Sequence, residues 1–388
     1  MTRPVVLLCL LIFGNTFAVG AFPVLLPDIG QAVGVDDFAL GVLAGAFGFA
    51  RLASDLPAGL LITHHLRRAR VIGAVAVTAG VLCLGLGGPY WLLVAGRILS
   101  GVGHTLVMLS GITGVVRYAR RNSHGLAHNA YEMSGMLGIL GGMVAAGFLP
   151  GDWPWNVTIL VAAVPQLLGL LLLPMLMRAI PVDAGGPAGL PLFSRGMDAE
   201  GPAPGAPRGV SRLTVLAFLA GALLALAWSS VGQFILPLRA SREFGLDRDG
   251  VALLLAIPQL VDVLLLLPLG SLADRSSRAR VLAVVLLVLA GGVAAVAFGP
   301  LSIVMIGCVF FGIGLASWML PVALLNRDGS ARLVAWRTAL YRVGVDAGVF
   351  LGPVLSGLLA QNAMLWVIGV ATSAALVAVS IALLRVRT

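Results

Sequence analysis

Residues 281–326 read VLAVVLLVLAGGVAAVAFGPLSIVMIGCVFFGIGLASWMLPVALLN and contain no Asp, Glu, Lys, Arg or His. A helix needs roughly 20 consecutive apolar residues to cross the hydrocarbon core of a bilayer. The stretch is therefore long enough for two crossings, with Gly299-Pro300 as the turn between them. Its apolarity is unbroken, which favours helices, because the strands of a membrane barrel alternate between apolar and polar residues.

Uncharged blocks of this kind recur along the chain, which is 59% hydrophobic and 11% charged. Soluble domains carry about 25% charged residues, so the composition excludes an ordinary water-soluble fold. We expect an all-α membrane protein with twelve transmembrane helices. The predicted spans are 4–29, 38–62, 70–87, 90–114, 127–149, 156–177, 213–237, 250–272, 280–298, 301–325, 335–359 and 363–384. The first is too long for a signal peptide, and we interpret it as a retained helix.

The chain contains an internal repeat, which divides it into two six-helix bundles. An offset of 211 places Pro57 and Gly59 on Pro268 and Gly270, and nearby glycine pairs follow the same offset. Such a series indicates two parallel repeats, an architecture of secondary transporters. We predict an N-terminal bundle at 1–178, a Pro- and Gly-rich cytoplasmic linker at 179–212 and a C-terminal bundle at 213–388.

The basic residues indicate the orientation, since short cytoplasmic loops are enriched in Lys and Arg. All 25 basic residues are arginine. Apart from three within helices (Arg51, Arg97, Arg342) and three on the opposite side (Arg239, Arg242, Arg248), they lie on the side of the termini. We therefore expect both termini in the cytoplasm and the protein in a bacterial inner membrane. The net charge of +9 then reflects topology, and we expect the lipid bilayer and no nucleic acid as a partner.

The residue types available restrict the possible chemistry. Without lysine, neither a GxxxxGK[ST] phosphate loop nor a Schiff base can form. Cys9, Cys83 and Cys308 lie in apolar spans without metal-ligand spacing, and the series His124, His128 and Glu132 lacks further ligands. We predict no metal, no cofactor and no enzymatic activity. A non-transporting membrane enzyme or receptor-like protein is a remote alternative.

Three stretches resemble signatures of the major facilitator superfamily. Residues 270–278, GSLADRSSR, are similar to its loop signature GxLaDrxGrr, with Ser277 in place of glycine. Residues 59–67, GLLITHHLR, correspond to the first-half copy but lack its acid, and 97–103, RILSGVG, resemble RxxxGxG. The resemblance covers the whole chain. It implies a transporter that works by alternating access, with cytoplasmic gate loops whose residues here are Gly59, Arg67, Gly270, Asp274, Arg275 and Arg278.

Glycines on the fifth and eleventh helices resemble a motif of the family's bacterial drug/proton antiporter branch. They are Gly138, Gly142, Gly348 and Gly352, and Gly138 stands where the motif has proline. Two interpretations remain open. The glycines either allow close helix packing or form the hinge of an antiporter.

Seven ionisable residues are predicted inside the membrane, where such groups face a partner or a watery cavity. They are Arg51, Asp55, Arg97, Glu132, Asp262, Arg342 and Asp346. Arg51 with Asp55, and Arg342 with Asp346, are four residues apart and can pair within one helix. The alternative is that these charges exchange partners between the halves. Arg51 maps onto Asp262 by the 211 offset, so a pair between these two residues is another possibility.

Glu132 is our first choice for a group that carries the coupling proton, followed by Asp55, Asp262 and Asp346. A carboxyl group in a low-dielectric cavity can load and release a proton when its surroundings change. The alternative for Glu132 is an ion pair with an arginine near the cytoplasmic end of the fourth or fifth helix.

In the family, helices 1, 4, 7 and 10 line the solute cavity, which implies a set of contact residues here. The candidates are Asn15, His104, Trp228, Gln233, Gln259 and Trp318, each with ordinary packing as the alternative. They would form a mostly apolar cavity that suits an amphipathic small molecule. We expect a monomer that exports such molecules in exchange for protons; an importer or facilitator of a metabolite is the alternative.

Overall fold

The first half of the chain is entirely helical in the residues that the structure describes. The computed structural model describes residues 1–120, 124–180, 212–325, 331–362 and 364–386, without the side chains of 124, 125 and 331–336. The side chain of His124 and most of the predicted linker therefore lie outside the described part. The helices of this half are α1 (Arg3–Asn15), α2 (Phe17–Val33), α3 (Asp37–Gly85), α4 (Tyr90–Tyr118), α5 (His124–Phe148), α6 (Trp155–Ala162) and α7 (Val164–Ala179).

The second half repeats this organisation, and one of its helices contains a π-helical segment, η2. Its elements are α8 (Arg212–Ala227), η2 (Trp228–Ile235), α9 (Leu236–Arg242), α10 (Arg248–Arg275), α11 (Arg278–Phe298), α12 (Leu301–Leu315), α13 (Leu320–Leu325), α14 (Ala331–Gln361) and α15 (Leu365–Arg385).

Ten helical stretches of the described chain are long and apolar enough to cross a membrane. One of them, α3, has 49 residues and breaks at His65, so it supplies two crossings. Another crossing comes from α5, whose 25 residues span about 37 Å at 1.5 Å per residue. The all-helical fold in two six-helix bundles, predicted from the sequence, is confirmed.

The loop predicted between the second and third spans is instead helical. Only His65 leaves the helical region, with φ −142° and ψ 61°, and α3 continues on both sides of it. The glycine of the loop signature is Leu66 in this half. Without a glycine or proline to end the helix, the segment keeps its backbone hydrogen bonds through a single kink.

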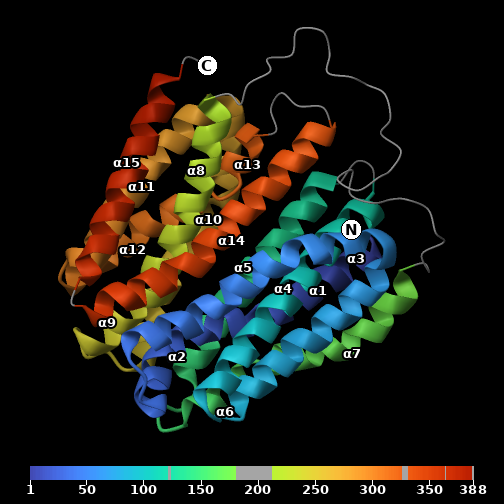
Figure 1. The fold of residues 1–388 in the computed structure, drawn as a ribbon. Helices are drawn as coiled ribbons and strands as arrows, with labels where there is room; N and C mark the ends of the chain where they lie inside the picture. Colours follow the sequence, from blue (N-terminus) through green and yellow to red (C-terminus); the bar gives the residue numbers. More distant parts are fainter. Residues whose placement is uncertain (121–123, 181–211, 326–330, 363, 387–388) are drawn as a thin grey trace.

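The two bundles meet along antiparallel helix pairs that cross between the halves (Figure 1). At Gly41 and Gly45 of α3, an added Cβ would strike the carbonyl oxygens of Pro353 and Phe350 of α14. Gly48 comes equally close to the α14 backbone. The helices can approach this closely because these positions carry no side chain. A second cross-half contact joins α5 and α10, where Gly147 packs on Ala252.

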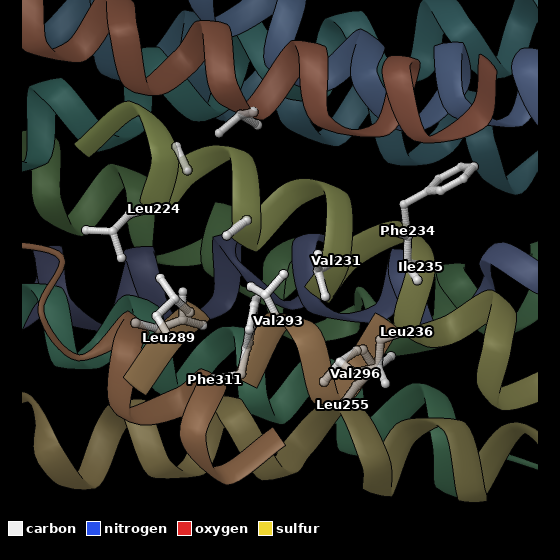
Figure 2. Close-up of a cluster of buried hydrophobic side chains, with 14 of the residues drawn as sticks. Leu224, Val231, Phe234, Ile235, Leu236, Leu255, Leu289, Val293, Val296 and Phe311 are labelled. Carbon is white, nitrogen blue, oxygen red and sulfur yellow. The ribbon is translucent and has the colours of Figure 1, made fainter. Parts of the chain in front are cut away.

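The second bundle has a continuous apolar core. Figure 2 shows Leu224 of α8 and Val231 of η2 on the side of α11 and α12, near Val293 and Phe311, whereas Phe234 of η2 points away from them. All five side chains are buried. Outside the core, large apolar residues such as Leu86, Trp91 and Leu171 are exposed. An apolar exterior of this extent suits contact with lipid tails.

Candidate functional site

Four charged side chains meet where α3 and α14 cross. Arg51 Nη2 lies 2.5 Å from Asp346 Oδ1, and Arg342 Nη2 lies 3.0 Å from Asp55 Oδ1. Arg342 also lies 3.9 Å from Asp346 within α14. Asp346 is fully buried, and its side chain is roughly 22 Å along α14 from Gln361, near the middle of a membrane-spanning helix. We call these four residues the charge quartet.

The register of the two helices explains the pairing. The base precedes the acid by four residues on α3 and on α14, and the helices run antiparallel. Each arginine therefore faces the acid of the other helix. Neutralisation of Arg51 by Asp55 within α3 is not seen, whereas Arg342 and Asp346 approach within one helix as well as across the interface. Asp262, which the internal offset suggested as a possible partner, is not the partner of Arg51 in the described structure, where Arg51 pairs with Asp346.

Three further side chains, those of Glu132, His104 and Phe47, lie around the quartet. Glu132 of α5 is half-buried and lies within electrostatic range of Arg342 and of His128. His104 of α4 is buried within electrostatic range of Arg51 and Arg342. Its ring lies 5.4 Å from the ring of Phe47, and the Arg51 guanidinium lies 5.7 Å from the same ring. The quartet is thus part of a larger cluster that draws on α3, α4, α5 and α14.

Arg97 lies beside this cluster but is held in another way. Its guanidinium stacks 3.7 Å from the Phe22 ring centroid and 4.9 Å from that of Phe47, and it donates a hydrogen bond to the Ala44 carbonyl at 3.2 Å. The faces of aromatic rings carry negative potential and attract a guanidinium. Arg97 therefore fixes the packing of three helices of the first half and does not bridge the halves.

Asp262 lies apart from the quartet, on α10. It is buried, and its hydrogen-bond partner is the Gln259 side chain at 3.5 Å. Its other carboxylate oxygen has no partner within the described residues. The structure therefore brings Asp262 and Gln259 together but gives them no guanidinium.

The aromatic candidates of the second half face each other. The Trp228 and Trp318 rings are 6.4 Å apart at 72°, an edge-to-face contact. Trp228 begins the π-helical segment η2, which also holds Gln233, and both side chains are partly exposed. Single π-helical turns in α-helices often occur at functional sites. In the sequence, the only sign of this π-helical segment is a group of polar residues within an apolar span.

Asn15 lies elsewhere. It lines a pocket inside the first bundle together with Arg70 and Gln166, so it does not face Trp228 and Trp318 as the prediction of a shared solute cavity required. The reason is that α1 ends at Asn15 and the chain turns at Thr16, which directs the amide toward α7.

The helix-packing glycines lie at close contacts. An added Cβ at Gly138 or Gly142 would meet the α1 and α2 backbone at Phe13 and Phe17. The corresponding positions Gly348 and Gly352 face α8 and η2 in the same way. This geometry favours the packing interpretation of these glycines over the hinge.

The gate-loop residues make local contacts. Arg278, at the start of α11, lies 2.7 Å from Asp274 at the end of α10, where Arg275 is exposed and Gly270 is partly buried. In the first half, Arg67 donates to the Met177 carbonyl at 2.8 Å, near the end of α7, and Gly59 is buried. Each loop is thus tied within its own half.

A second layer of cross-half contacts lies at the ends of the helices away from the termini. Arg248, at the start of α10, lies 2.8 Å from Asp28 and donates to the Trp153 carbonyl at 2.9 Å and to the Thr158 hydroxyl at 3.0 Å. Arg242 lies 2.7 Å from Asp37. We call these contacts the outer layer. In Figure 1 the bundles meet at this end, near α2 and α9, and diverge toward the end with the termini.

The outer layer was not predicted from the sequence, although a signal for it was present. Arg239, Arg242 and Arg248 were the arginines that broke the charge rule for cytoplasmic loops. In the structure each has an acidic partner, which for Arg239 is Glu243 at 2.7 Å. Arginines on the less basic side of a membrane protein are therefore candidates for ion pairs.

In the Arg248→Ala variant, the outer layer should be open for a larger fraction of the time. Arg248 holds four groups of the first half, and a loss of about 1.4 kcal/mol shifts a two-state equilibrium about tenfold. The measurement is the labelling rate of Ala252→Cys, buried behind this layer, by an impermeant maleimide in a cysteine-free background. Arg278→Ala, which removes a local pair, should leave the rate unchanged. Equal rates with and without Arg248 would show that this residue does not hold the layer closed.

Comparisons with known proteins agree with this architecture. A model of the Major Facilitator Superfamily matches residues 8–238 and 217–388. An "uncharacterized MFS-type transporter" of Enterobacter sp. (strain 638) is 25% identical over 374 residues, 93% of this chain and 90% of the relative. The nucleoside transporter NupG (D323A mutant) has a TM-score of 0.74 at 13% identity, over 98% of this chain and 99% of that structure. The peptide transporter POT in complex with sulfate has a TM-score of 0.77 at 14% identity, over 99% and 94%. The chain is therefore a multi-pass membrane transporter that belongs to the Major Facilitator Superfamily.

Proposed function

We propose that the protein is a proton-coupled exporter of small amphipathic molecules. The observation that carries this proposal is the charge balance of the central cluster. Two guanidinium groups, of Arg51 and Arg342, pair with the carboxyl groups of Asp55 and Asp346, and a third carboxyl group, of Glu132, lies within electrostatic range of Arg342. Arginine keeps its charge at any physiological pH, and a net charge in a low-dielectric site is costly. The cluster is therefore neutral when it holds one proton.

The same cluster supports a mechanism of coupling. The quartet joins α3 of one half to α14 of the other. Its ion pairs therefore oppose separation of the two halves near the middle of these helices. A proton that arrives at Glu132 removes one of the charges that compete for Arg342 and strengthens the hold of Asp55 and Asp346. Loss of that proton draws Arg342 toward Glu132 and loosens the cross-half pairs. Proton binding is thus linked to the relative position of the halves.

The arrangement of the layers indicates which side is open. With the predicted cytoplasmic termini, the outer layer of Arg248 and Arg242 faces the periplasm and is closed. The gate loop at Asp274 pairs only locally at the other end and is 67% exposed. We infer an inward-facing state, which can take up a solute from the cytoplasm or the inner leaflet.

Trp228 and Trp318 support the proposed class of solute, because both side chains are aromatic and partly exposed. The four charges of the quartet are already paired with one another. An apolar site with few free charges favours an amphipathic molecule over a polyanion.

The test is transport in liposomes that contain the purified protein. With an imposed pH gradient, a panel of lipophilic cations and neutral amphipathic compounds should include solutes that accumulate against their gradient, with proton movement in the opposite direction. Proton movement in the same direction as the solute would make the protein an importer. Flux that is equal with and without the pH gradient would show a facilitator and overturn proton coupling.

A further inference from the structure

The pocket inside the first bundle is separate from the charge quartet and is lined by polar side chains from three different helices. Asn15 ends α1, Arg70 lies on α3 just after the break at His65, and Gln166 lies in the first turn of α7. The remaining wall is largely apolar and includes Leu11 and Leu173. All five residues belong to the first half, so the pocket lies within one bundle.

The amide groups in this pocket have no hydrogen-bond partner among the described residues. Asn15 is 7% and Gln166 is 5% exposed, yet Asn15 Nδ2, Gln166 Nε2 and Gln166 Oε1 are all unpaired. Buried polar groups without partners are unfavourable, so a native structure rarely leaves three together. The unpaired N–H groups of both amides call for an occupant that accepts hydrogen bonds, and Gln166 Oε1 calls for a donor such as a water molecule beside it.

Arg70 adds a charge that the protein itself does not balance. It is 3% exposed and donates to the Val107 carbonyl at 2.5 Å, but no carboxylate lies within ion-pair distance of it in the described part of the chain. A buried guanidinium without a counter-ion is unfavourable, because its desolvation is not compensated. Water can satisfy the amides but cannot neutralise this charge. A metal cation is excluded, because Arg70 would repel it.

The free space in the pocket further narrows the choice of occupant. It has room for a monatomic ion or a very few waters, and none for an organic solute. Arg70, Asn15 and Gln166 all present N–H groups to this space, and the lining contains no acid. We propose that this pocket is a binding site for a small monatomic anion such as chloride, which neutralises Arg70 and joins α1, α3 and α7. The proposal does not depend on the transported solute.

The experiment uses the full-length protein in detergent, with chloride replaced stepwise by gluconate at constant ionic strength. The midpoint of thermal unfolding should rise with chloride and then level off, as mass action requires for a site in the folded state. The Asn15→Leu/Gln166→Leu variant should fold, because it removes donors and leaves no unsatisfied amide, but its midpoint should no longer depend on chloride. The matched control is Thr78→Val: Thr78 lines the same pocket, but its hydroxyl donates to the Ala74 carbonyl at 2.9 Å. This variant should keep the chloride dependence.

A second measurement covers the case in which the double variant does not fold. Crystals of the unaltered protein with bromide should show an anomalous scattering peak between Arg70, Asn15 and Gln166. Water alone at that place would overturn the proposal. A chloride effect of equal size in wild type and double variant would also overturn it, since that effect would be a general property of the salt.

Discussion

The Glu132→Gln protein should lose proton-driven transport and retain exchange of solute. Glutamine has nearly the size of glutamate and keeps its hydrogen-bonding oxygen, but it neither binds nor releases a proton at physiological pH. In the proposed mechanism Glu132 competes with Asp55 and Asp346 for Arg342. The glutamine variant resembles the protonated state permanently, so the cluster stays neutral and a proton gradient can no longer drive the relative movement of the halves.

The measurement separates the two activities in the same liposomes. Accumulation driven by a pH gradient should fall to the level of protein-free liposomes, while counterflow of labelled solute without a gradient continues. Asp152→Asn is the matched control, because Asp152 is an exposed acid in the loop before α6 and should leave both activities intact. If Glu132→Gln still accumulates solute uphill, the coupling proton binds elsewhere, and Asp262 is the next carboxyl to test.

The crossing helices could be predicted from sequence because the rule that produces them is local. Any apolar block of sufficient length must satisfy the hydrogen bonds of its own backbone in lipid, and residues 281–325 do so in α11, α12 and α13. The interruptions inside crossings were not predicted. Examples are the turn at Thr16 between α1 and α2, the turn at Ala163 between α6 and α7, and the π-helical η2. They depend on how neighbouring helices pack, which hydrophobicity does not report.

The charged residues of the site were predicted from the sequence, but the ion pairs that they form were not. The sequence located Arg51, Asp55, Arg342 and Asp346, since ionisable groups inside apolar spans are conspicuous. Their partners depend on the register of α3 against α14, which Gly41, Gly45 and Gly48 set through backbone contact. A spacing of four residues on each helix allows a pair within the helix or across to another, and a single sequence does not distinguish them. The internal offset suggested Asp262, whereas the structure pairs Arg51 with Asp346, because the halves share a fold but differ in their charges.

Neutralisation of one member of the Arg51–Asp346 pair should lower the stability of the folded protein more than neutralisation of both. Asp346→Asn leaves the Arg51 guanidinium, which is 12% exposed, without its carboxylate, and Arg51→Gln leaves the fully buried Asp346 with only the 3.9 Å contact to Arg342. Loss of one partner of a buried pair costs roughly 3–5 kcal/mol, whereas replacement of both is often nearly neutral. The double variant should therefore be more stable than either single variant, although it should transport poorly because one cross-half pair is absent.

A double-mutant cycle on thermal unfolding in detergent, with transport measured in parallel, tests this pair. The comparison cycle is Arg278→Gln with Asp274→Asn, an exposed i,i+4 pair within one loop, where the coupling should be no more than about 0.5 kcal/mol. Additive effects at Arg51 and Asp346 would mean that the two charges do not stabilise each other across the interface. A large coupling accompanied by normal transport in the double variant would mean that the pair stabilises the fold without taking part in alternation. Only coupling together with lost transport supports a pair that holds the halves in one state and must release them in the other.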